Sequence, residues 1–265
     1  MSDDVYEVFA VRYARVDRPR TQNFLGGDPH DAPMPLNYYV WVVRNAARTV
    51  VVDTGYGPKS AERRGRPLEL EVPDALARLG VDATAVEDVI ITHLHYDHAG
   101  NIERFPRARF HIQDQEMAYA TGRSMTHALL RMPFDVQHVT AMVERLYEGR
   151  VVFRDPVDEV APGITVHHIG GHSMGLQVVR VMTARGPVVL ASDATHFYEH
   201  FETDRAFVIV QDVTALLEGY RTLRRLAGSD RRVVPGHDPL VMDRYPAPDD
   251  CLRGIAVRLD VDPTG

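Results

Sequence analysis

The sequence THLHYDHAG at residues 92–100 concentrates potential metal ligands in one short stretch. The ligands lie within six positions, and they are His93, His95, Asp97 and His98. The apolar run at residues 89–91 predicts a buried strand before them, and Gly100 predicts a sharp turn after them. Because histidines and carboxylates in such spacing rarely serve anything except metal binding or catalysis, this stretch is the first candidate site.

The spacing of these four ligands predicts two binding directions. Side chains alternate between the faces of an extended chain, so His93, His95 and Asp97 would share one face. His98 has the opposite parity, and its side chain reaches the same region only if the backbone turns. We therefore expect His93 and His95 to aim at one metal ion, and Asp97 and His98 to aim at a second.

Composition excludes several classes of protein. The chain has 265 residues and a net charge of −7, and this acidic balance argues against a nucleic-acid partner. A single cysteine, Cys251, excludes an intrachain disulfide and a thiolate-rich metal site. The N-terminus lacks an apolar signal segment, and no apolar run is long enough to span a bilayer. We expect a cytoplasmic protein without membrane association, acting on a small-molecule substrate as a monomer or homodimer.

Patterns of apolar residues predict a mixed α+β chain. Strands are expected at residues 5–16, 37–43, 49–52, 88–92, 109–113, 151–153, 158–161, 164–169, 177–182, 187–191 and 231–234. Helices are expected at residues 73–80, 114–121, 135–147 and 212–227. Residues 18–35 read as a long loop at the rim of the site, residues 59–71 as irregular, and the tail from 246 as Pro- and Asp-rich. We find no internal repeat or linker, so residues 1–265 are predicted to form one domain.

Three more potential ligands follow predicted strands in the second half of the chain. His172 comes after two glycines, Asp193 ends an apolar strand, and His237 follows a Pro-Gly pair. Each of them alone could simply stabilise a turn. Together with the first stretch they complete the donor set of a binuclear site, which needs one carboxylate between two groups of ligands.

The order of these motifs resembles the metallo-β-lactamase superfamily. The resemblance rests on His93-x-His95-x-Asp97-His98, followed by His172, Asp193 and His237, and it spans about residues 37–240. Residues 53–55, Asp-Thr-Gly, lie where that family carries its first loop motif. The resemblance implies a four-layer αββα sandwich, with the metal ions at one edge of two facing sheets.

Within the superfamily, the pattern is most similar to the N-acyl-homoserine lactonase branch. The motifs that carry this similarity are GHSMGLQ at residues 171–177 and SDA at residues 192–194, followed by Phe201-Glu202. The resemblance implies one ion held by His93, His95 and His172, a second held by Asp97, His98 and His237, and Asp193 as the bridge. Those lactonases carry a tyrosine three residues after the bridging aspartate, to bind the substrate carbonyl. This chain has His196 there and Tyr198 two residues further on, and either could take that role.

The resemblance implies a hydrolase that opens a lactone. A hydroxide bridging two divalent ions would attack the carbonyl, with Asp97 as proton shuttle and His196 or Tyr198 as donor to the oxyanion. Nitrogen and oxygen ligands without sulfur suit Zn²⁺, and also Mn²⁺, Co²⁺ or Fe²⁺. Asp53 is expected to accept a ring N–H from a ligating histidine. Apolar side chains that could line the substrate pocket are Met125, Met132, Phe134, Met174, Phe197, Phe201 and Phe207.

Other functions remain open on the same donor set. A hydrolase of another ester, a thioester or a cyclic amide would use the same ions, although β-lactamases of this pattern lack a carboxylate at the position of Asp193. An iron-dependent oxidoreductase is a further alternative, but the di-iron reductases carry Glu where this chain has His95, and the persulfide dioxygenases load one iron. A non-catalytic interaction protein would be expected to have lost ligands, and none is lost here.

Overall fold

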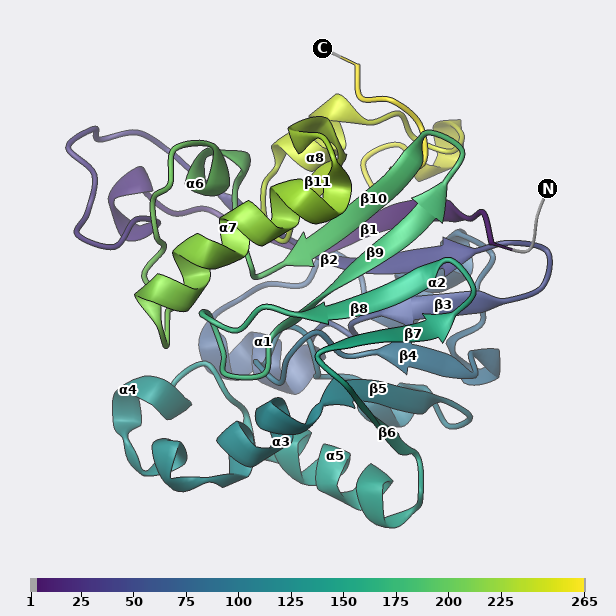
Figure 1. Cartoon of the computed structure of the whole chain (residues 1–265), viewed down its shortest axis with the longest axis horizontal. Coiled ribbons are helices and arrows are strands. Elements are labelled where there is room, and N and C mark those ends of the chain that lie inside the picture. Colours follow the sequence, from purple (N-terminus) through teal and green to yellow (C-terminus); the bar gives the residue numbers. More distant parts are fainter. Residues whose placement is uncertain (1–3, 265) are drawn as a thin grey trace.

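The computed structural model describes residues 4–264, and these form two β-sheets that face each other (Figure 1). The first sheet has seven strands in the order β12-β1-β2-β3-β4-β5-β6. Their bounds are β1 Glu7–Val16, β2 Leu36–Arg44, β3 Thr49–Val52, β4 Asp88–Ile90, β5 Arg109–Gln113, β6 Val151–Arg154 and β12 Ala256–Arg258. The second sheet has five strands in the order β11-β10-β9-β8-β7. Their bounds are β7 Val157–Ala161, β8 Ile164–His168, β9 Gln177–Thr183, β10 Gly186–Ser192 and β11 Val233–Pro235.

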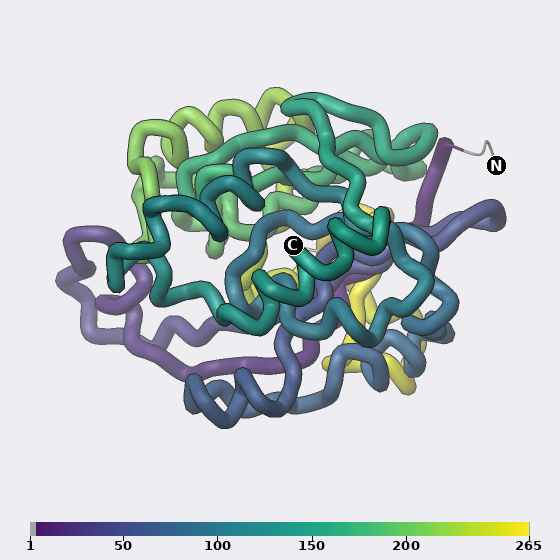
Figure 2. Tube along the Cα trace, turned by 90° about the horizontal axis from the view of Figure 1, so that it is seen from below, coloured from purple at the N-terminus to yellow at the C-terminus, as the bar shows by residue number. Residues whose placement is uncertain are grey.

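Helices cover the outer face of each sheet. Their bounds are α1 Pro58–Arg64, α2 Val72–Arg78, α3 Asp114–Thr121, α4 Ala128–Arg131, α5 Val136–Tyr147, α6 Tyr198–Glu202, α7 Val213–Ala227 and α8 Leu240–Arg244. In Figure 2, α7 runs along the top of the trace and the segment with α1 and α2 along the bottom, with the strands between them. Among residues 4–264, no helix combines the length and the apolar character needed to cross a bilayer.

Alternation along the strands explains the layers. In β1, Val8 and Ala10 pack into the core between the two sheets, whereas Phe9 and Val11 pack into the core beneath α2 and α5. A strand that is apolar on both faces can be covered on both sides, as buried sheets require. The predicted four-layer αββα sandwich is therefore confirmed.

The parallel strands bring the candidate ligands to one edge. β3, β4, β5 and β6 pair in parallel, and so do β10 and β11 of the other sheet. The segments that leave the carboxyl ends of parallel strands emerge on the same side of a sheet. The turns that follow β3, β4, β10 and β11 therefore meet. In this order, they carry Asp53, the 92–100 stretch, Asp193 and His237.

The predicted strands and helices are present with small shifts of their bounds, whereas the short elements α1, α4, α6, α8 and β12 were not predicted. The helices expected at 114–121, 135–147 and 212–227 are observed as α3, α5 and α7, and α7 is capped by the Asp212 carboxylate, which accepts the Ala215 N–H. Helix α1 was missed because only Ser60 of its residues is buried, so no apolar period marks it. Strand β12 was missed because three residues that pair with β1 at the sheet edge carry no periodic signal.

The long loop at residues 18–35 is tied to the segment around α6. The Asp28 carboxylate pairs with Arg20 at 3.0 Å and with Arg205 at 2.7 Å. The Phe24 ring lies 3.7 Å beneath the Arg205 guanidinium and packs edge-on against His200, with ring centroids 4.8 Å apart. The loop is thus an ordered part of the structure beside α6 (Figure 1).

His200 is expected to make the folded protein less stable in acid. Burial lowers the pKa of His200 to about 4, and its neutral ring uses both nitrogens, with Nε2–H donating to the Asn23 carbonyl and Nδ1 accepting the Phe197 N–H. The unfolded chain, with a histidine pKa near 6.5, binds this proton more readily, so stability rises with pH between about 4 and 6.5. We expect His200 to contribute about 3 kcal/mol across this range, measured as urea unfolding of the metal-free protein at several pH values.

The control is His200→Gln, whose amide can still donate to the Asn23 carbonyl but cannot titrate. Its unfolding free energy should change less between pH 4 and 6.5 than that of the wild type. Parallel curves for the two proteins would show that His200 titrates normally.

Candidate metal centre

The 92–100 stretch leaves β4 and turns back on itself. The Ile90 end of β4 is followed by irregular chain, and the His98 N–H donates to the His95 carbonyl at 3.1 Å. The strand is thus shorter than the predicted 88–92, and the alternation assumed for an extended chain does not apply at Asp97. After the turn, His98 shares one compact group of donor atoms with Asp97 and His237 and another with His93 and Asp193, so its ring lies between the two expected directions.

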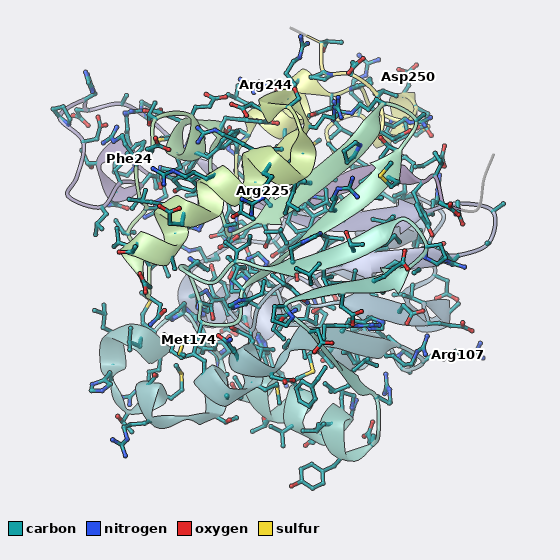
Figure 3. All side chains as sticks on the ribbon, viewed as in Figure 1. Phe24, Arg107, Met174, Arg225, Arg244 and Asp250 are labelled. Atoms are coloured by element: carbon teal, nitrogen blue, oxygen red, sulfur yellow. The ribbon has the colours of Figure 1, made fainter. Side chains whose placement is uncertain are left out.

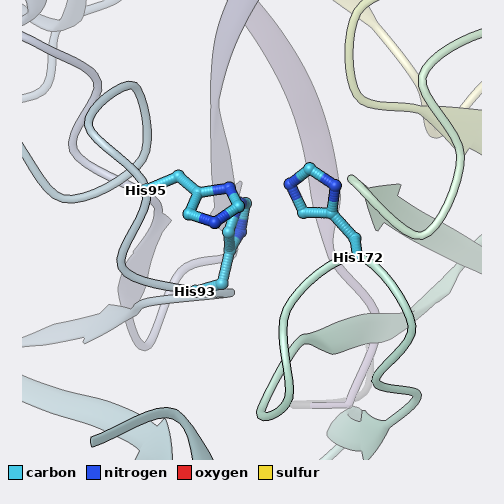
Figure 4. Close-up of side chains that lie close together, drawn as sticks. All are labelled: His93, His95 and His172. Atoms are coloured by element: carbon cyan, nitrogen blue, oxygen red, sulfur yellow. The ribbon is translucent and has the colours of Figure 1, made fainter. Parts of the chain in front are cut away.

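The first group of donors consists of His93, His95 and His172, whose donor atoms lie within 4.8 Å of one another. Figure 4 shows the three rings turned towards each other, with His172 reaching in from a separate loop. That loop follows β8 and passes close to α7, since a Cβ on Gly171 would lie 2.6 Å from the Leu216 backbone. Gly171 also has a φ of +82°, so glycine is required there for both reasons.

The second group consists of Asp97, His98 and His237. The Nε2 atoms of His98 and His237 each lie 3.8 Å from the Asp97 Oδ2. The Nδ1–H of His237 donates to the Asn37 carbonyl at 2.8 Å, which fixes the orientation of the ring. All three side chains are largely buried, and Asp97 is the most exposed of them.

Asp193 lies between the two groups. Its Oδ1 is 3.1 Å from the His237 Nε2 and 3.3 Å from the His98 Nε2. Its Oδ2 is 3.2 Å from the His172 Nε2 and 3.9 Å from the His93 Nε2. The His237 Nε2 is also 3.3 Å from Oδ2. The carboxylate therefore lies between the two groups of imidazoles, a position from which it could bridge two ions.

The donor set fits divalent metal ions. Within the described chain, the Nε2 atoms of His93, His98 and His172 and the Oδ1 of Asp193 are buried without a hydrogen-bond partner. Burial lowers the pKa of His93 and of His95 well below the usual value, so both imidazoles stay neutral and keep a lone pair for a ligand bond. Buried polar atoms without partners are costly, and a bound cation would satisfy them.

Like the Nδ1 of His237, those of His98 and His172 are held by groups outside the cluster. His98 Nδ1–H donates to the Asp53 Oδ2 at 2.7 Å, as expected from the sequence, and His172 Nδ1–H donates to the Ile209 carbonyl at 2.6 Å. Asp53 also accepts the Thr92 N–H at 2.7 Å and the Thr92 hydroxyl at 2.8 Å. These bonds place the Nε2 lone pairs towards the centre and raise the basicity of the imidazoles.

Glu116, in the first turn of α3, is a site residue that sequence reasoning missed. It is fully buried, and its carboxylate accepts the Leu94 N–H at 2.8 Å, the Gly175 N–H at 3.0 Å and the Ser173 hydroxyl. It thereby ties the loop of His93 and His95 to the loop of His172. Nothing in the sequence marks it, because a glutamate in the first turn of a helix is usually solvated.

His196 and Tyr198, the two candidate donors, point in different directions. The His196 Nε2 lies 3.0 Å from the Asp193 Oδ2, so its ring belongs to the cluster. The Tyr198 ring packs beside α8, where the guanidinium of Arg244, the last residue of that helix, lies 3.9 Å from the ring centroid (Arg244 is labelled in Figure 3). Its hydroxyl is buried without a hydrogen-bond partner among the described residues. This placement gives Tyr198 no contact through which to bind a substrate carbonyl.

Replacing Tyr198 by phenylalanine should therefore leave turnover within about twofold of the wild type. The hydroxyl that is removed has no partner, so stability should be unchanged or about 1 kcal/mol higher. Steady-state hydrolysis and thermal unfolding measure both effects. A decrease of tenfold or more in kcat with an unchanged fold would show that the Tyr198 hydroxyl takes part in catalysis.

A narrow apolar cleft opens onto the first group of donors. Its volume is about 60 Å³, and His95 and His172 form its inner end. Its walls come from α3, from α4 with the residues after it and from the segment before α7. They are Tyr119, Leu129, Leu130, Met132, Pro133, Val208, Ile209, Val210 and Gln211. A larger cavity of about 680 Å³ lies between α1 and α5 and contains none of the seven ligands.

The seven apolar residues expected to line the pocket divide into several sets. Met132 lines the cleft, and Phe134 packs edge-on against His95 with centroids 4.6 Å apart. Met174 is exposed on the same side of the molecule (Figure 3), and Met125 packs against the core under the first sheet. The fully or almost fully buried side chains are Phe197, Phe201 and Phe207.

Comparison with known proteins identifies the family. The family model of the metallo-beta-lactamase superfamily matches residues 33–237. The N-acyl homoserine lactonase AiiB of Agrobacterium fabrum is 28% identical over 184 residues, which cover 62% of this chain and 64% of AiiB. An N-acyl homoserine lactonase of Bacillus sp is 26% identical over 224 residues, covering 77% of this chain and 82% of that protein.

The fold is shared with solved structures. A crystal structure of a quorum-quenching N-acyl homoserine lactone lactonase superposes with a TM-score of 0.75 at 21% identity, covering 91% of this chain and 95% of that one. The match to AiiB extends over less than two thirds of the AiiB length, so the likeness in sequence concerns part of that enzyme. With the family match extending over most of its length, this chain belongs to the metallo-beta-lactamase superfamily.

Proposed function

We propose that this protein is a dinuclear metal-dependent hydrolase that opens a lactone similar to an N-acyl-homoserine lactone. The observation that carries the proposal is the position of Asp193, whose carboxylate lies between two groups of imidazoles, with Oδ1 close to His98 and His237 and Oδ2 close to His172. The names of the relatives support the choice of substrate, since two of them are N-acyl homoserine lactonases. Acting on such a signal, the protein would be a quorum-quenching enzyme.

The seven side chains divide between two divalent ions. His93, His95 and His172 would hold the first ion, Asp97, His98 and His237 the second, and Asp193 both. Zn²⁺ is the first choice for such a set, with Mn²⁺, Co²⁺ and Fe²⁺ as alternatives. When bound, a pair of divalent ions lowers the pKa of water and polarises a substrate carbonyl.

Asp97 is the residue of this set that is best placed to move a proton. Its side chain is 11% exposed, whereas those of His98 and His237 are 1% and 3% exposed, so Asp97 can reach an incoming substrate. Its carboxylate would accept the proton of the attacking water and pass it to the leaving ring oxygen. The products are then an alcohol and a carboxylic acid, and ionisation of that acid at neutral pH drives ring opening to completion.

The surroundings of the cleft suit an acyl chain. Leu129 is 79% exposed, Met132 48% and Val208 39%, although all three are apolar and line the cleft. A cleft of about 60 Å³ is far smaller than the few hundred Å³ of typical small-molecule sites. We therefore place the scissile carbonyl at the inner end and the acyl chain on the exposed apolar rim.

The test is a substrate panel assayed by pH-stat, after separate loading with Zn²⁺, Mn²⁺, Co²⁺ or Fe²⁺. We expect two metal ions per chain and acid release from acyl-homoserine lactones, with chelated protein as the inactive control. Activity on thioesters or cyclic amides, without activity on lactones, would show that the protein is a hydrolase of another class. One iron per chain with oxygen consumption would favour the oxidoreductase alternative.

The single domain over residues 1–265, the monomer or homodimer and the cytoplasmic location stay predictions from the sequence.

A further inference from the structure

His196 lies in the turn between β10 and α6, and the backbone of this turn is bonded to the segment that carries His237. The His237 N–H donates to the His196 carbonyl at 3.0 Å. The adjacent Gly236 N–H donates to the Thr195 carbonyl, also at 3.0 Å. Because both bonds join this turn to the end of β11, the fold determines where the His196 side chain points.

The His196 ring is held with its Nε2 towards Asp193. Its face stacks on Phe207, with centroids 3.6 Å apart and an angle of 18° between the planes. Its neighbours on the other sides are ligand histidines, with centroid distances of 5.4 Å to His172 and 4.9 Å to His237. The ring is 8% exposed, so it lies among the ligands and not at the mouth of the cleft.

The distances of His196 and His172 from Asp193 Oδ2 are those of ligands that share an ion, and the His237 Nε2 lies slightly farther from this oxygen, at 3.3 Å. His196 Nε2 lies 3.0 Å from this oxygen, and His172 Nε2 lies 3.2 Å from it. Two donor atoms with bonds of roughly 2.1 Å to one ion are about 3.0 Å apart at a right angle and about 3.4 Å apart at a tetrahedral angle. His172, Asp193 and His196 therefore form a further compact group of donor atoms.

We propose that His196 is a further protein ligand, through Nε2, of the ion held by His93, His95 and His172. This inference rests on the proposed dinuclear function, because it requires an ion at that position. With Asp193 the ion would have five protein donors, more than the four of a closed zinc site. A donor set of this size favours metals that readily take six ligands, such as Mn²⁺, Fe²⁺ or Co²⁺.

Cobalt loading tests the proposal without relying on activity. Visible absorption of Co²⁺ depends on its coordination number and is weakest for six ligands. In His196→Ala, we expect a stronger and shifted absorption, because the ion has lost an imidazole. Competition with a chelating dye should show one of the two ions bound at least about 100-fold more weakly, and the other unchanged.

The matched control is His200→Gln, because His200 is buried in α6 near the same Phe207, with centroids 5.3 Å apart, but bonds to the Asn23 carbonyl. Its cobalt spectrum and both affinities should equal those of the wild type. His196→Gln, which keeps a hydrogen-bond donor but is a poor ligand, serves as the second variant, and circular dichroism verifies the fold of each.

The outcomes separate this inference from the proposed function. Either His196 variant could retain the wild-type cobalt spectrum and both metal affinities, while turnover is lost in His196→Ala and restored in His196→Gln. This result would make His196 a donor to the substrate, and it would overturn the inference alone. Fewer than two ions in the wild type would overturn the dinuclear function and the inference with it. A changed spectrum in both His196 variants, with His200→Gln unchanged, supports a metal ligand.

Discussion

Replacing Asp193 by alanine is expected to weaken both halves of the metal centre and to abolish turnover. The reason is geometric, because Oδ1 lies 3.1 Å from the His237 Nε2 and Oδ2 lies 3.2 Å from the His172 Nε2. One side chain is thus shared by two groups of ligands, and its loss reduces both donor sets. We expect each affinity to fall at least about 100-fold. Atomic emission analysis after desalting and a lactone assay measure the two effects.

Two variants control this experiment. Asp193→Asn has the same shape but only one oxygen, so it should retain one ion better than the other. His168→Ala removes a histidine whose Nε2–H bonds to the Met174 carbonyl, outside the cluster, and it should keep both ions. Two ions bound with wild-type affinity in Asp193→Ala would show that Asp193 does not bridge them.

Replacing Glu116 by alanine is expected to destabilise the protein by about 3 kcal/mol and to weaken metal binding as well. The change leaves the Leu94 and Gly175 N–H groups and the Ser173 hydroxyl without their acceptor in a buried place. Gly175 has little freedom to adjust, since a Cβ there would lie 2.1 Å from the Glu116 backbone nitrogen. Urea unfolding of the metal-free protein measures the first effect, and dye competition the second.

The control for Glu116 is Asp114→Ala in the same first turn of α3. Asp114 is exposed and has no described role in the site, so its loss should cost no more than about 0.5 kcal/mol. Equal losses in the two variants would mean that Glu116 acts only through the stability of α3. Unchanged metal affinity in Glu116→Ala would mean that the two ligand loops are positioned without it.

The resemblance of the motifs implied the four-layer fold, and local patterns predicted most of the elements and the positions of the seven candidate ligands. Apolar runs of the right length predicted most strands, and the ligands follow these strands directly, as His93 follows β4 and His237 follows β11. Helices such as α7 were found where an apolar stripe and a capping residue, Asp212, coincide. Short elements without such signals, α1 and β12, were not found.

The sequence by itself determined which residues could bind metal and in what order, because ligand types and spacings are local properties of the chain. Only the tertiary structure decided how the two Asp193 oxygens lie relative to the histidines, that Glu116 joins their loops, and that His196 faces the ligands while Tyr198 packs beside α8. These contacts link segments far apart in the chain, or depend on the direction of a single turn. No spacing encodes them, since packing against the rest of the molecule determines which way each side chain points.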